Sequence, residues 1–148
     1  FASGHIPELA NFHKLAGLYG GLLGSALISS QLIRLALPVQ KRQVGSWGVL
    51  IAIALTLTFA LLAQTYAVPL FLCWSLIGVV AAVFLPHDNM PKRLLYGLGT
   101  CIMPFNVIFI RKSNLLPADI SWHVFHTLIA IWIVVIGYIL SGTNRQRP

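Results

Sequence analysis

The sequence predicts an all-α, polytopic transmembrane helical bundle of five helices. The first observation is composition, because 57% of the 148 residues are hydrophobic and only 9% are charged, whereas soluble domains carry about 25% charged residues. The second is that residues 44–86 contain no Asp, Glu, Lys or Arg. That stretch is long enough for two membrane spans of about 20 residues each. Together these observations predict one integral membrane helical domain over residues 1–148.

Five continuous apolar segments account for the predicted helices. Each would extend roughly 25–35 Å as a helix, which matches a hydrocarbon core of about 30 Å. Helices are expected because lipid offers no partner for an unpaired backbone amide. Four spans with one re-entrant segment form the competing arrangement. The five segments are residues 15–37, 47–67, 69–85, 93–110 and 120–140, with Ser46 and Asp119 as expected N-caps of the second and fifth helices.

The basic residues lie in the short connections and predict an orientation. With five spans, one end of the bundle holds seven of them and the other end three. An excess of Lys and Arg marks the cytoplasmic side, so we expect an N-terminus outside or lumenal and a C-terminus in the cytoplasm or its equivalent. The same residues would contact anionic lipid headgroups, and no nucleic-acid partner is expected. The seven are Arg34, Lys41, Arg42, Lys92, Arg93, Arg145 and Arg147, and the three are Lys14, Arg111 and Lys112.

Titratable side chains gather where the last apolar segment begins, in the sequence DISWHVFH at residues 119–126. Residues three or four apart share a helix face, so Trp122, His123 and His126 are expected on one face. Five spans place His13 at the same end of the bundle. We therefore expect a shallow pocket lined by His13, His123 and His126 near the membrane surface. The face continues through Asp119, Ala130 and Gly137, and this stripe is expected to point into the bundle.

Several chemical interpretations of this pocket stay open. The three histidines, with Glu8 or Asp119, would supply enough ligands for a metal ion. A b-type haem would need an axial histidine, and acid–base work on a lipophilic substrate needs one well-placed imidazole and no cofactor. The structural alternative is that His and Trp side chains anchor the helix end among the lipid headgroups. The sequence does not name the cofactor, if one is bound.

Three further features predict packing. Gly17, Gly20, Gly21 and Gly24 lie at spacings that let helices approach closely, either within the bundle or against a partner membrane subunit. Pro104 predicts a kink in the fourth helix, because it removes one backbone donor and crowds the preceding turn. Asn106 is expected to bond across to a neighbouring helix, with a ligand contact as the alternative.

Two stretches resemble a family of small membrane proteins, the anthrone oxygenases and their relatives. Residues 93–116 resemble a family helix through a Pro-Phe pair, an aliphatic-Phe pair and an Asn-containing turn. Residues 122–126 resemble the start of the family's last helix, where a Trp and a His lie four apart. The similarity covers about half the chain and implies cofactor-independent oxygenation of an electron-rich polycyclic phenol, with His126 as the base and Trp122 and Asn114 shaping the pocket. The matching residues are Pro104, Phe105, Ile108, Phe109, Asn114, Trp122 and His126.

Two classes of function therefore remain. One is a small oxygenase-like enzyme that acts on a lipophilic aromatic molecule at the histidine-lined pocket, with His126, His123, His13, Trp122 and Asn114 as its candidate residues. The other is a non-catalytic accessory subunit of a larger membrane complex, for example one that transfers electrons. The short loops favour the accessory subunit, because no soluble domain is present to handle a polar substrate.

Overall fold

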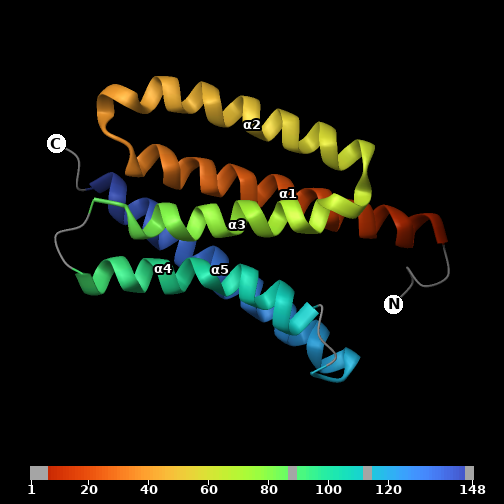
Figure 1. The fold of residues 1–148 in the computed structure, drawn as a ribbon. Helices are drawn as coiled ribbons and strands as arrows, with labels where there is room; N and C mark the ends of the chain where they lie inside the picture. Colours follow the sequence, from red (N-terminus) through yellow and green to blue (C-terminus); the bar gives the residue numbers. More distant parts are fainter. Residues whose placement is uncertain (1–6, 87–89, 112–114, 146–148) are drawn as a thin grey trace.

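The computed structural model describes residues 7–86, 90–111 and 115–145 (Figure 1). Over these residues the chain is all-α and contains no strand, so the predicted fold class is confirmed. Five α-helices are joined by two short 3-10 turns and one π-helical segment. The α-helices are α1 (Pro7–Ala36), α2 (Arg42–Leu62), α3 (Ala67–Val83), α4 (Met90–Phe105) and α5 (Ala118–Arg145); the other elements are η2 (Val39–Lys41), η3 (Gln64–Tyr66) and the π-helix η4 (Asn106–Arg111).

The helices alternate in direction, with α1, α3 and α5 running one way and α2 and α4 the other (Figure 1). The most extensive contact joins α1 to α3. The α4 helix packs on α3, α5 packs on α4, and α2 lies against the outside of α1. Toward the end of the bundle at which the N-terminus lies, α4 and α5 diverge from α1 and α3 (Figure 1).

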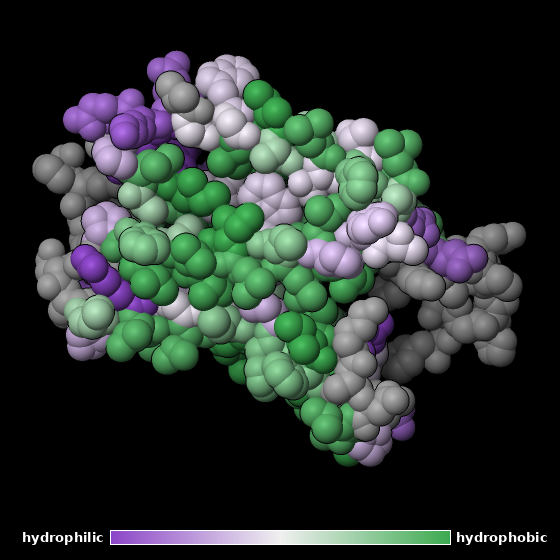
Figure 2. Space-filling view, in the orientation of Figure 1, coloured by the Kyte–Doolittle hydropathy of each residue, from purple (hydrophilic) through white to green (hydrophobic). Residues whose placement is uncertain are grey.

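The chain is an integral membrane protein by the length and apolar character of its helices. Five described segments are long and apolar enough to cross a membrane. On the face shown in Figure 2, hydrophobic side chains cover most of the middle of the bundle and hydrophilic ones gather toward its ends. This distribution means that the outer surface contacts lipid along most of its length. The five segments are Leu15–Ala36, Gly45–Leu62, Gln64–Val83, Met90–Arg111 and Asp119–Gly142.

The helix ends differ from the sequence-based expectation in several places. The first helix begins at Pro7 and the last continues to Arg145, so both extend beyond their apolar segments. Ser46 does not cap α2, which begins at Arg42, and its hydroxyl instead donates to the Arg42 carbonyl at 2.7 Å. Asp119 lies in the first turn of α5 rather than at its cap, where a carboxylate still interacts favourably with the helix dipole.

Small residues make the close contact between α1 and α3. The Ser29 hydroxyl donates to the Trp74 carbonyl on α3 at 2.6 Å. A Cβ built on Gly78 would lie 2.6 Å from Ser29 Oγ, so any larger residue would force the Ser29 hydroxyl to move. Such small residues let helix backbones approach within a membrane, where apolar side chains gain little by leaving lipid for protein. Their packing therefore holds the centre of the bundle together.

The fourth helix changes its hydrogen-bond pattern just after Pro104. Pro104 lies inside α4, which ends at Phe105, and the π-helix η4 follows directly. Proline lacks a backbone donor and crowds the turn before it, whereas the π-helical segment comes after it. The kink expected at Pro104 stays a prediction. Asn106 lies at the start of the π-helical segment, fully buried against α5.

Candidate functional site

The first three turns of α5 carry the aromatic and titratable side chains that the sequence singles out. Trp122, His123 and His126 all lie there, and all three are exposed. The Trp122 and His126 rings lie 4.2 Å apart between centroids, and the Trp122 and His123 rings 5.0 Å apart. The predicted grouping of these three residues on one part of the helix surface is therefore confirmed.

His126 has one ring nitrogen engaged. Its Nδ1 lies 2.8 Å from the Trp122 carbonyl oxygen, and Phe125 packs edge-on with a centroid distance of 5.3 Å. A carbonyl oxygen only accepts hydrogen bonds, so Nδ1 must carry the proton in this contact. In the neutral ring Nε2 then holds the free lone pair, which is the arrangement that an imidazole base requires.

The predicted direction of this stripe is wrong. All five members of the stripe are exposed, so they point away from the bundle and do not line an interior pocket. The inner face of α5 carries Trp132, Ile136 and Ile139 instead, which are at most 9% exposed. The exposed stripe, named the α5 outer face from here on, consists of Asp119, His123, His126, Ala130 and Gly137.

Two hydrogen bonds to η4 set the rotation of α5. The Ser121 hydroxyl donates to the Ile110 carbonyl at 2.8 Å, and the Asn106 amide donates to the Phe125 carbonyl at 2.9 Å. The Asn106 contact confirms the expected bond between helices. Because these bonds fix the side of α5 that carries Ser121 and Phe125 against η4, His123 and His126 must face outward.

Three residues that the sequence predicts near the α5 histidines have side chains that the structure does not describe. His13 belongs to the second turn of α1, but its side chain and that of Glu8 lie outside the described set, and so does Asn114. Among the described side chains, no three His, Cys, Asp or Glu residues group closely enough to hold a metal ion. The three-histidine metal site therefore stays a prediction.

The glycines of α1 divide into two groups. Gly21 would place a Cβ 4.0 Å from the Phe71 ring of α3, so it belongs to the packing within the bundle. Gly17, Gly20 and Gly24 would meet nothing within 4 Å. The expected packing within the bundle therefore applies to Gly21, while the other three leave a small-residue surface open to lipid or to another protein.

Several polar residues in the centre of the bundle were not predicted as site residues from the sequence. Trp132 on α5 is only 9% exposed, and its indole Nε1 has no hydrogen-bond partner among the described residues. The Asn106 Oδ1 atom likewise has none, although the side chain is fully buried. Ser25, Ser29, Ser75 and Thr100 are all buried around the same point. Their occurrence inside three apolar segments was the sequence feature that could have indicated a polar site in the bundle.

An apolar groove lies between α1 and α3. It is an open groove of about 480 Å³. No titratable or hydroxyl side chain lines it, so it offers shape for a hydrocarbon chain without chemistry. Its lining residues are Ile33, Ala36, Leu37, Leu76, Ile77, Val80, Ala81 and Phe84.

The fold and its apolar surface define the protein as a small, all-α, multi-pass membrane protein. Comparison with protein-family models, with curated proteins and with solved structures finds no match for this chain. Its function must therefore be inferred from its own residues and their placement.

Proposed function

We propose that the protein is a non-catalytic subunit of a larger membrane complex that docks on its partner through the α5 outer face. The observation that supports this proposal is the exposure of His123, His126 and Asp119 on a helix within a membrane. Polar side chains at the start of a membrane-spanning helix lie among the lipid headgroups or pair with a polar group on another helix. The outward direction of the stripe means that such a group is expected from a second protein.

The deeper part of the same face favours a helix as the partner. Ala130 lies near the middle of the span and Gly137 nearer its far end, and a Cβ on Gly137 would meet nothing within 4 Å. Headgroup anchoring accounts for His and Trp at a helix end, but it gives no role to small residues further along. Small exposed residues instead allow another membrane helix to approach closely.

The test compares two exposed glycines that have no neighbour within 4 Å, Gly137 on α5 and Gly48 on α2. We expect Gly137→Leu to convert the native complex to the mass of the free subunit on native gels, because the added side chain holds the partner helix away. The matched control, Gly48→Leu, should leave the complex intact. Helical content and thermal midpoint in detergent should be the same for both variants. A Gly137→Leu protein that migrates like the wild type would rule out docking through this face.

A second candidate function rests on the geometry of His126. With Nδ1 held by the Trp122 carbonyl, Nε2 is free to take the phenolic proton of a polycyclic aromatic molecule that arrives from the lipid. This is the role that the resemblance to anthrone oxygenases implies for His126, with dioxygen as the oxidant. We expect His126→Ala to abolish oxygen uptake with an anthrone as the probe while the variant keeps the helical content and thermal midpoint of the wild type. The accessory role predicts no uptake by the wild-type protein, and full uptake by the variant would remove His126 as the base.

We also propose the orientation that the charges favour. The end of the bundle formed by the α1–α2 and α3–α4 connections and the C-terminus of α5 carries Arg34, Lys41, Arg42, Lys92 and Arg93. Positive residues favour the cytoplasmic side, so this end should face the cytoplasm or its equivalent. We expect a glycosylation acceptor added at the N-terminus to be modified and one added at the C-terminus to remain unmodified. The reverse pattern would contradict the assignment.

A further inference from the structure

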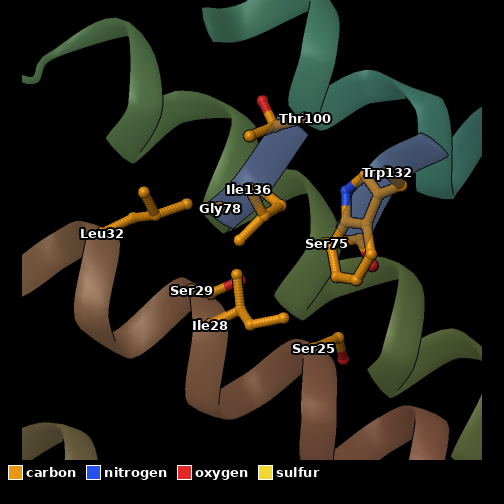
Figure 3. A pocket seen from close by; sticks show the side chains of 9 residues that line it. All are labelled: Ser25, Ile28, Ser29, Leu32, Ser75, Gly78, Thr100, Trp132 and Ile136. Carbon is orange, nitrogen blue, oxygen red and sulfur yellow. The ribbon is translucent and has the colours of Figure 1, made fainter. Parts of the chain in front are cut away.

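A small polar cavity lies at the centre of the bundle, where four helices meet (Figure 3). Its volume is about 10 Å³, which is close to the minimum that one water molecule needs. Hydroxyl and indole groups line it among aliphatic side chains. The polar lining residues are Ser25 and Ser29 from α1, Ser75 from α3, Thr100 from α4 and Trp132 from α5.

The cavity contains a buried hydrogen-bond donor without a protein partner. Trp132 is 9% exposed, and no described group accepts a hydrogen bond from its Nε1. The nitrogen edge of the indole is turned toward the middle of the cavity (Figure 3). A buried donor without an acceptor costs about 1–3 kcal/mol, and lipid offers no substitute for the missing acceptor. The geometry therefore calls for an acceptor inside the cavity.

The hydroxyl groups around the cavity have already donated their protons in hydrogen bonds and can accept further ones. Each donates its proton to a backbone carbonyl: Ser25 to Leu22 at 2.9 Å, Ser29 to Trp74 at 2.6 Å, Ser75 to Phe71 at 2.9 Å, and Thr100 to Tyr96 and Gly97, both at 2.9 Å. A hydroxyl has one donor and two acceptor lone pairs. With their protons engaged, these hydroxyl groups present acceptors to the cavity.

We propose that this cavity binds one water molecule, which accepts a hydrogen bond from Trp132 Nε1 and donates its two protons to hydroxyl oxygens on the other helices. That gives the water three hydrogen bonds, the usual number for a buried water in proteins. The site takes a neutral ligand that both donates and accepts. A cation would face the positive edge of the indole N–H, and an anion would find only that one free donor among hydroxyls whose protons are already engaged.

The water would join α5 to the rest of the bundle. The backbone of α5 packs mainly on α4 and η4, and at this cavity Trp132 of α5 lines the same space as the serines of α1 and α3. A bridge from Trp132 to the serines would therefore tie α5 to the α1–α3 pair at the centre of the membrane. This role is independent of whether the α5 outer face binds a partner.

The test uses the wild-type chain, labelled with ¹⁵N at its tryptophan indoles and placed in lipid nanodiscs. Trp74 is a matched internal control, because it is also buried and its Nε1 donates to Thr56 Oγ1 at 3.2 Å. We expect a magnetisation-transfer cross peak from the Trp132 indole proton to water and none from that of Trp74. Trp132→Phe identifies its signal; if that variant does not fold, substitution of the other three tryptophans identifies it by elimination.

Two results would overturn the proposal. No water cross peak at Trp132 would mean that the cavity is dry and that the indole donor is unsatisfied. Cross peaks of equal strength at Trp132 and Trp74 would mean that exchanging hydroxyl protons carry the signal, since the Thr56 hydroxyl beside Trp74 provides that route without a cavity water.

Discussion

Replacing Gly78 with alanine is expected to destabilise the bundle by about 1–3 kcal/mol, the usual cost of overpacking a filled interior. The new Cβ would lie 2.6 Å from Ser29 Oγ, with the Ser29 Cβ at 3.5 Å and its Cα at 3.7 Å behind it. Ser29 is short and its hydroxyl is bonded to the Trp74 carbonyl. The clash therefore forces either the loss of that bond or a separation of α1 from α3. Thermal unfolding in detergent measures the effect.

Two variants control the Gly78 experiment. Gly48→Ala on α2 introduces the same methyl group where nothing lies within 4 Å, so it should leave the thermal midpoint unchanged or raise it slightly, because alanine favours a helix over glycine. The double variant Ser29→Ala with Gly78→Ala removes the clashing oxygen and should recover part of the loss. Equal stability of Gly78→Ala and wild type would show that the α1–α3 contact is looser than described.

Replacing Asn106 with alanine is expected to lower stability by about 1–2 kcal/mol, with the effect concentrated at the start of α5. The variant loses the 2.9 Å hydrogen bond to the Phe125 carbonyl, and a bond between membrane helices contributes about 0.6–1.7 kcal/mol. It also leaves space at a fully buried position. Hydrogen exchange of the α5 amides after residue 118 should rise, since this bond holds α5 against η4.

A comparison of two substitutions separates these contributions. Asn106→Leu keeps the branched shape of the side chain with larger methyl groups, leaves no cavity, and removes both the hydrogen bond and the unpartnered Oδ1, so it should be less damaging than Asn106→Ala. Thr58→Ala is the control for local bonds, because the exposed Thr58 hydroxyl donates only to Ala54 of its own helix at 2.9 Å. If Asn106→Ala unfolds like Thr58→Ala, the bond to Phe125 does not hold the helices together.

Both experiments concern packing within a membrane, where the hydrophobic effect does not drive helices together. Two kinds of interaction remain available there: close packing, as at Gly78, and hydrogen bonds between helices, as from the Asn106 side chain to the Phe125 carbonyl. They act at different places, one between α1 and α3 and the other between η4 and α5. A double variant should therefore lose close to the sum of the two single effects.

The sequence by itself determined the class of fold and the number of helices. Long apolar runs with few charges leave a chain only helices that cross lipid, and the short connections force neighbouring helices to alternate in direction. The bond from Asn106 to another helix also followed from residue type, because a buried amide in a membrane needs a partner. These features depend on local composition and on the solvent, so no knowledge of packing was required.

The tertiary structure alone decided which side of α5 faces the bundle. Spacing placed His123 and His126 on one face, but spacing is the same whether that face points inward or outward. The choice came from the hydrogen bonds of Ser121 and Asn106, which fix α5 against η4, and from the indole of Trp132, which is buried in the bundle. The predicted interior pocket failed for that reason: the rotation of a helix is set by its contacts with other segments, and no periodicity within the helix records them.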